Sequence, residues 1–206
     1  MPRGRLITIE GIDGAGKTTL ARALADAIDA RGHPVELLRE PGGVETSERI
    51  RALVKDPSLE ISPRAEALLY AAARAQLVHE RVEPLLDVGT HVLLDRYVDS
   101  SLAYQGVARG LGVEHVREIN RFATGELEPD RTLLLRISPA DGRARQAGRG
   151  ELPDRLEREQ ESFFAEIARA YEELAAAEPE RIRVIDASAT PSRVLFDALE
   201  QLADVL

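Results

Sequence analysis

Cysteine and tryptophan are absent from this sequence of 206 residues, and its 27 basic residues include only two lysines, Lys17 and Lys55. A chain without cysteine forms neither disulfides nor thiolate metal sites. No apolar run approaches the ~18 residues that a membrane span needs. The N-terminus also reaches Glu10 and Asp13 before a signal-peptide core could form. We therefore expect a cytoplasmic protein with no membrane partner.

Positive charge is scarce as well, because 36 acidic residues outnumber the basic ones and give a formal net charge of −9. Binding along a nucleic-acid polymer needs an extended basic face, so we do not expect such a partner. A small anionic substrate remains possible where arginines converge locally. The length and the hydrophobic content of 44% suit one globular domain that spans residues 1–206.

Apolar stretches bounded by turn residues alternate with longer segments of helical periodicity. Strands are expected over 5–10, 34–39, 91–95, 131–137 and 182–186. Helices are expected over 17–31, 44–54, 63–87, 97–107, 113–123, 139–147, 154–177 and 191–205. Strands that alternate with helices predict an α/β protein, with a parallel sheet in a three-layer α/β/α fold.

The segment "GIDGAGKT" at residues 11–18 matches the phosphate-binding pattern G-x-x-x-x-G-K-[ST] at every fixed position. Glycines let successive N–H groups face an anion, and the N-terminus of the following helix adds partial positive charge. Lys17 could reach the β and γ phosphates, and the Thr18 hydroxyl could bind Mg²⁺. A glycine turn with an incidental lysine is the alternative. The residues predicted to bind ATP are Gly11, Ile12, Asp13, Gly14, Ala15, Gly16, Lys17, Thr18 and Thr19.

A second candidate element is "HVLLDRY" at residues 91–97, an apolar strand that ends in Asp95. A carboxylate at the end of a strand beside the phosphate loop can hold the hydrated magnesium ion, although Asp95 could instead simply cap a helix. The adjacent Arg96 would face the same crevice, at the carboxyl end of the sheet where ligands of open α/β folds bind. Its charge favours an anionic ligand there.

A phosphate loop alone does not separate a kinase from a switch GTPase, a motor or a partitioning ATPase. Guanine-specific switches read their base with Asn-Lys-x-Asp, but the lysine outside the loop, Lys55, follows Val54. The arginine-rich and glycine-rich segment at 143–155 predicts a mobile lid that excludes water from a transferring phosphoryl group; a solvated surface connection is the alternative. A kinase is favoured, with a kinase for another nucleotide and a nucleotide-dependent binding switch as alternatives.

Four stretches together resemble bacterial thymidylate kinase more specifically than the phosphate loop does by itself. They are "EGIDGAGKTT" (10–19), "REPGGVETSERIR" (39–51), "DRYVDSSLAYQGVARGLG" (95–112) and "DRLEREQ" (154–160). The resemblance runs from Leu6 to about Asp186. It implies a P-loop kinase fold with a five-stranded parallel sheet and a short lid, usually a homodimer. The implied reaction is ATP + dTMP giving ADP + dTDP with Mg²⁺.

The resemblance also implies a binding site for the dTMP base and sugar. Tyr70 and Arg74 lie one helical turn apart. Tyr70 corresponds to a residue that stacks on thymine, and Arg74 corresponds to one that donates hydrogen bonds to O4 of thymine. Ser101 and Gln105 match positions that contact the pyrimidine edge. Tyr104 matches the residue that crowds the sugar 2′ position and so favours deoxyribose. Without the resemblance, Tyr70 would be read as a core aromatic residue.

For the phosphates, Arg51 and Arg96 correspond to ligands of the acceptor phosphate, a role that suits paired guanidinium hydrogen bonds. Asp13 matches an acidic position near the acceptor sugar 3′-hydroxyl and phosphate. No basic residue lies between Gly11 and Gly16, and relatives with this type of loop supply positive charge from the lid.

Arg149 is the lid arginine predicted to contact the transferring phosphoryl group, with Arg155 and Arg145 as the next candidates. The predicted catalytic residues are Lys17, Arg96, Arg149 and Asp13, and the predicted metal ligands are Thr18 and Asp95. Pro41 matches a family proline whose preceding peptide is often cis; an ordinary trans turn is the alternative, and it is the commoner form of an X-Pro peptide.

Overall fold

A computed structural model describes residues 2–148 and 154–206 of the chain. Its centre is one sheet of five strands, all parallel, in the order β2-β3-β1-β4-β5. The strands are β1 (Leu6–Glu10), β2 (Val35–Arg39), β3 (His91–Asp95), β4 (Arg131–Arg136) and β5 (Ile182–Asp186). Each lies within a predicted range, so the parallel α/β prediction is confirmed.

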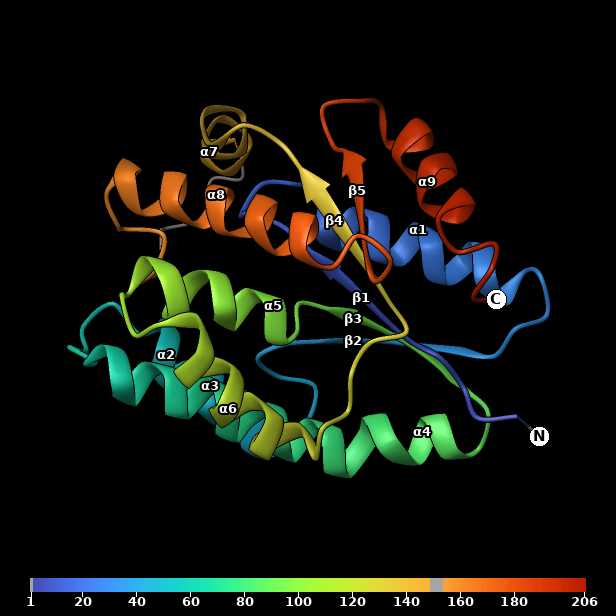
Figure 1. Cartoon of the computed structure of the whole chain (residues 1–206), viewed down its shortest axis with the longest axis horizontal. Helices are drawn as coiled ribbons and strands as arrows, with labels where there is room; N and C mark the ends of the chain where they lie inside the picture. The colour runs from blue at the N-terminus through green and yellow to red at the C-terminus, as the bar shows by residue number, and fades with distance from the viewer. Residues whose placement is uncertain (1, 149–153) are drawn as a thin grey trace.

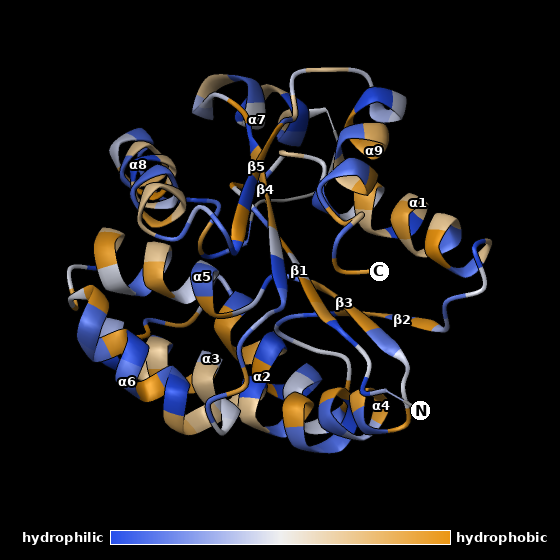
Figure 2. Ribbon diagram, turned by 45° about the vertical axis from the view of Figure 1, so that its right-hand side comes forward, coloured by the Kyte–Doolittle hydropathy of each residue, from blue (hydrophilic) through white to orange (hydrophobic). Residues whose placement is uncertain are grey.

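Helices cover both faces of this sheet, which explains why the central strands are buried on both sides. On one face, α1 (Lys17–Asp29) packs on β1, β2 and β3, and α9 (Pro191–Glu200) packs on β5. On the other, α4 (Glu83–Asp87) contacts β3 and α8 (Glu161–Ala177) contacts β5. Figure 1 shows the resulting three layers. In Figure 2 the strands are largely hydrophobic, whereas the helices carry residues of both kinds.

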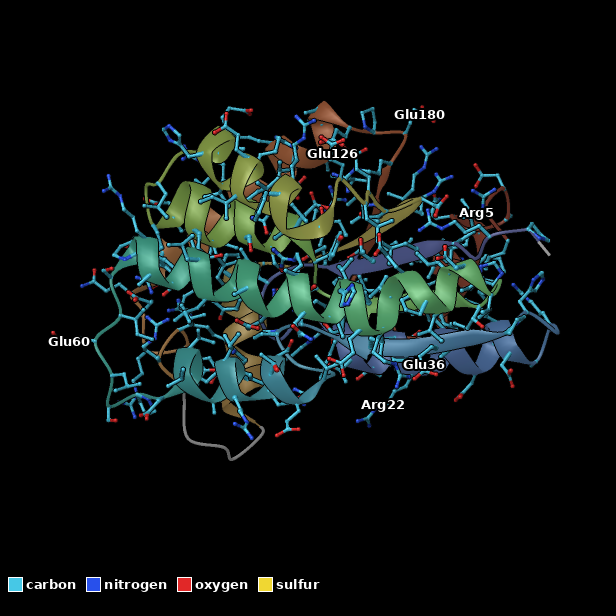
Figure 3. All side chains as sticks on the ribbon, turned by 90° about the horizontal axis from the view of Figure 1, so that it is seen from below. Arg5, Arg22, Glu36, Glu60, Glu126 and Glu180 are labelled. Carbon is cyan, nitrogen blue, oxygen red and sulfur yellow. The ribbon has the colours of Figure 1, made fainter. Side chains whose placement is uncertain are left out.

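The predicted helix over 63–87 is a continuous rod with a change of winding. It consists of α3 (Pro63–Leu77), the π-helical segment η1 (Val78–Val82) and α4, and Figure 3 shows the rod crossing the molecule. Pro84 lacks an N–H and its ring crowds the preceding turn, so a widened turn ahead of it is expected on physical grounds. The sequence periodicity found the rod but not the π segment.

Three further helices match their predictions within about two residues: α2 (Glu45–Lys55), α6 (Val113–Thr124) and α7 (Pro139–Ala147). The predicted helix over 97–107 is divided into α5 (Val98–Ser101) and the π-helical segment η2 (Leu102–Ala108). The first residues of the predicted lid, 143–147, belong to α7.

Two predicted helix ends were wrong. The helix predicted from 154 begins at Glu161, because Oδ1 of Asp154 accepts the N–H groups of Leu156 and Glu157 and so stabilises a turn. The helix predicted to reach 205 ends at Glu200, after which the N–H groups of Leu202 and Ala203 bond three residues back. None of the helices described combines the length and the hydrophobicity that crossing a membrane requires.

Candidate active site

A cleft of about 350 Å³ opens at the carboxyl ends of β1, β2 and β3, with α2, α3 and η2 forming its other walls. The sheet extends in opposite directions from β1, and open α/β sheets bind ligands at such a point. The predicted site residues that line the cleft are Asp13, Gly14, Gly16, Lys17, Thr18, Thr19, Arg51, Tyr70, Arg74, Asp95, Arg96, Ser101, Tyr104 and Gln105. Gly11, Ile12 and Ala15 belong to the same loop but are buried outside the cleft lining.

The phosphate loop turns sharply between β1 and α1. Gly14 and Gly16 have φ values of 81° and 96°, a left-handed region that favours glycine. Gly16 is the N-cap of α1 and lines the cleft. The helix therefore directs its first backbone N–H groups and its partial positive charge at the place where an anion would bind.

Lys17 is buried at the first position of α1, where its Nζ donates to the carbonyl oxygens of Gly11 and Ile12 at 2.9 Å each. Burial and the neighbouring Arg96 lower the pKa of Lys17 to about 8, against the opposing effect of Asp13. The ammonium group is therefore fixed beside the loop, and a phosphate ligand would favour its charged form.

Thr18 and Asp95 meet across the cleft floor, where Oγ1 of Thr18 donates to Oδ2 of Asp95 at 2.8 Å. A hydroxyl and a carboxylate are the oxygen ligands that Mg²⁺ prefers, so this pair fits the ion chemically. Within residues 2–148 and 154–206 no group of three or more His, Asp or Glu side chains is placed to hold a metal. Phosphate oxygens and water would have to complete the coordination, as is usual for Mg²⁺.

Asp13 joins the phosphate loop to two residues on another wall of the cleft, Arg96 and Tyr104. Its Oδ1 accepts from Nη2 of Arg96, and its Oδ2 accepts from the Tyr104 hydroxyl at 3.2 Å. Burial opposes ionisation of Asp13, but Arg96 and Lys17 outweigh it and lower the pKa to about 2. The charged pair therefore ties the phosphate loop to the carboxyl end of β3.

Arg96 follows β3 with φ at 73°, a conformation that non-glycine residues rarely adopt. Its Nη1 donates to Oγ of Ser100 at 3.0 Å and to the Gly11 carbonyl at 3.2 Å. Behind it, the buried Glu10 carboxylate accepts from Ser100 Oγ and from the Tyr97 N–H. Burial and then other acidic charge raise the pKa of Glu10. We did not predict this role from the sequence, although an acidic residue ending a buried strand was a usable signal.

Arg74 is 2% exposed, and four protein groups accept its hydrogen bonds. Nε donates to Oε2 of Glu40 at 2.7 Å and Nη2 to the Tyr97 carbonyl at 2.8 Å. Nη1 donates to the side-chain oxygens of Ser101 and Asn120. The predicted base-reading arginine therefore also ties α3 to the segments after β2 and β3 and to α6.

Glu40 lines the cleft beside Arg74 and was not predicted as a site residue. It is 5% exposed, and its Oε1 atom has no hydrogen-bond partner among the described residues. Burial raises the pKa of Glu40 to about 7, although Arg74 opposes that shift. The Glu40-Pro41 peptide is cis, one of the two conformations that the sequence left open, and the Pro41 carbonyl accepts from Nη1 of Arg51 at 2.9 Å.

The far wall of the cleft carries Tyr70 from α3 and Gln105 from η2. Tyr70 is partly buried, and burial raises the pKa of its hydroxyl. Nε2 of Gln105 donates to Oε1 of Glu66 at 2.8 Å, and Glu66 is completely buried. Glu66 was not predicted as a site residue, although an acidic side chain one helical turn before Tyr70 was a usable signal.

The three arginines predicted as lid candidates are Arg149, Arg145 and Arg155. Arg149 lies outside the described residues. Nη2 of Arg145 donates to the Ala187 carbonyl at 3.0 Å, and Arg155 pairs with Glu66 at 2.5 Å. Both of these guanidinium groups are thus engaged by the protein away from the phosphate loop.

The helix α7 packs directly on the phosphate loop through two glycines. A Cβ atom at Gly142 would stand 2.7 Å from the Asp13 carbonyl oxygen, and one at Gly14 would stand 2.1 Å from the Gly142 carbonyl oxygen. Neither distance is tolerated by real side chains. A glycine inside a predicted helix is unfavourable on its own, and this close approach explains it.

A parallel sheet with a phosphate loop after β1, an acidic residue at the end of β3 and an arginine-lined cleft defines the class of phosphate-loop kinases. The family model described as "Thymidylate kinase" matches residues 9–196. A thymidylate kinase of Lactobacillus delbrueckii subsp. bulgaricus is 48% identical over 90% of this chain and 89% of its own length. That of Deinococcus radiodurans is 48% identical over 91% of both chains, and that of Pelotomaculum thermopropionicum is 44% identical over 99% and 95%. The chain belongs to the thymidylate kinase family, and it is a phosphotransferase.

Proposed function

We propose that the cleft described above is where this chain carries out the ATP-dependent phosphorylation of dTMP to dTDP, by in-line transfer. The observation that carries the proposal is the hydrogen-bonded pair of Asp13 and Arg96, because it joins a phosphate loop to an adjoining arginine-lined pocket. Donor and acceptor would then occupy one cleft, and alignment of the two is the main requirement of phosphoryl transfer.

On the donor side, the loop over residues 11–19 holds the ATP phosphates with its backbone N–H groups. Lys17 exchanges its carbonyl partners for phosphate oxygens and keeps its positive charge beside them. Thr18 and Asp95 would hold Mg²⁺. The ion, when bound, neutralises charge on the phosphate oxygens.

On the acceptor side, Tyr70 stacks on thymine, Ser101 and Gln105 contact its edge, and Tyr104 restricts the sugar 2′ position. Arg51 and Arg96 bind the acceptor phosphate, while Asp13 lies near the sugar 3′-hydroxyl. The guanidinium of Arg74 already faces protein acceptors. Its contact with O4 of the base would therefore be a shared, three-centre hydrogen bond.

The lid contributes Arg149, which contacts the transferring phosphoryl group.

The protein acts in the cytoplasm as a homodimer. Support for self-association comes from three adjacent helices, α2, α3 and α6, which expose large apolar side chains. These are Leu53 at 48% exposure, Leu68 at 57% and Phe122 at 92%.

An ADP-release assay with MgATP tests the proposal. The acceptors are dTMP, dUMP, UMP, dCMP, AMP and none, and the products are identified by chromatography. We expect strong preference for dTMP and formation of dTDP, with Lys17→Ala lowering turnover by about 100-fold or more. Preference for another acceptor would indicate a kinase for a different nucleotide. ATP hydrolysis without any acceptor would indicate a nucleotide-dependent switch.

A further inference from the structure

Gln105 presents an amide to the cleft, and an amide has two chemically different ends. Its nitrogen donates hydrogen bonds and its oxygen accepts them. Which end reaches a ligand therefore decides whether the ligand atom must be an acceptor or a donor. In this structure Nε2 of Gln105 is bound to Oε1 of Glu66 at 2.8 Å, and the side chain is 2% exposed.

Glu66 is a fixed partner, because two arginines hold its carboxylate and it is 0% exposed. Oε2 accepts from Nη2 of Arg155 at 2.5 Å and from Nη2 of Arg109 at 3.2 Å. Arg109 is in turn paired with Glu159 at 2.6 Å. A carboxylate offers acceptors only, so the Gln105 amide nitrogen must face Glu66, and the amide oxygen is left for the cleft.

We propose that Glu66 is a positioning residue that sets pyrimidine specificity by fixing the orientation of the Gln105 amide. The inference rests on the proposed base site. Thymine and uracil carry N3–H, a donor that an amide oxygen accepts. Cytosine has an acceptor at N3, so the same oxygen would face a lone pair and leave both groups unsatisfied. Discrimination against a base such as cytosine is strong when its binding leaves a buried polar group without a hydrogen-bond partner.

The test measures kcat/KM for dTMP, dCMP and dUMP in the wild type and in Glu66→Gln. A glutamine at 66 presents either a donor or an acceptor, so Gln105 can turn over. We expect the dTMP to dCMP ratio to fall about tenfold or more, because one buried hydrogen bond no longer fixes the amide. The dTMP to dUMP ratio should stay unchanged, since both bases carry N3–H.

Matched variants separate this role from a structural one. Glu159→Gln alters the same arginine network without touching Gln105 and should leave both ratios unchanged. Glu66→Asp keeps the charge for the arginines but withdraws the acceptor, so it should lower the dTMP to dCMP ratio and serves if Glu66→Gln does not fold. In a Gln105→Ala background, Glu66→Asp should change the ratio no further.

Equal losses with dTMP and dCMP, or an unchanged ratio in both Glu66 variants, would overturn the inference while leaving the proposed function intact. A further change of the dTMP to dCMP ratio by Glu66→Asp in the Gln105→Ala background would also overturn the inference. A wild type that does not phosphorylate dTMP would overturn the proposed function and this inference together.

Discussion

At the scale of single residues, the site brings buried charges of both signs together, and opposite charges outweigh burial at Asp13 but offset it only in part at Lys17. Lys17, Asp13 and Arg96 lie within one contact network. The lowered pKa of Asp13, about 2, keeps this carboxylate ionised at neutral pH. The pKa of Lys17, about 8, is low enough to enter the range of a kinetic experiment.

The pH dependence of ATP use should report Lys17. Its protonated form predominates below pH 8, so kcat/KM for ATP should be level near pH 7 and fall up to tenfold per pH unit above about 8 as the charge is lost. Steady-state kinetics from pH 6.5 to 10 with Lys17→Arg as control would measure this. Because arginine stays charged throughout, the control should not show that decline, and a level wild-type profile to pH 9.5 would refute the assignment.

Arg74 should matter for stability as well as for the base site. Arg74→Ala leaves Glu40 buried without its cation, and breaking a buried pair of this kind costs about 3–5 kcal/mol. Urea denaturation followed by circular dichroism would measure the loss. Arg49→Ala, which removes an exposed pair within α2, should change little. A fully stable Arg74→Ala protein would show that the hydrogen bonds around Arg74 contribute little.

At the scale of elements, the close packing of α7 on the phosphate loop gives a sharp test. Gly142→Ala places a Cβ atom 2.7 Å from the Asp13 carbonyl, so the loop or the helix must move. A displacement near 1 Å can cost about 100-fold in rate, and we expect kcat/KM for ATP to fall at least about tenfold. Initial-rate kinetics would show it.

The matched control is Gly148→Ala, since a Cβ there meets its nearest neighbour at an ordinary 3.5 Å. Alanine within a helix is intrinsically better than glycine, so an unchanged or improved Gly142→Ala enzyme would mean that α7 adjusts without disturbing the loop.

The strands and helices also show which features of the fold can be predicted from sequence patterns. The strands were predicted within a residue because their apolar runs are short and end at turn residues. The start of α8 was wrong because the Asp154 side chain competes with helical hydrogen bonds, which periodicity does not register. The π segments η1 and η2 were not predicted either, because an added residue within a helix barely alters the apolar pattern of the sequence.

At the scale of the whole molecule, the exposed apolar side chains of α2, α3 and α6 bear on assembly. Phe122→Asp should shift the protein from dimer to monomer, because a charge in an apolar interface is costly to bury. Sedimentation equilibrium across a range of concentrations would measure the shift. Val88→Asp, at an exposed apolar residue after α4, is the control and should leave the dimer intact. A wild type that is monomeric throughout would refute the homodimer.

The sequence by itself determined the parallel α/β fold and the phosphate loop, because strand ends and motif spacing are local properties. The residues of the cleft walls beyond the phosphate loop and the end of β3 were predicted only from the family resemblance. Only the tertiary structure decided the surroundings of those residues. Glu66 lies 39 positions from Gln105, and Glu40 lies 34 positions from Arg74. Contacts between such distant segments form only when the elements pack, so the partners that orient Arg96, Arg74 and Gln105 were visible only in the fold.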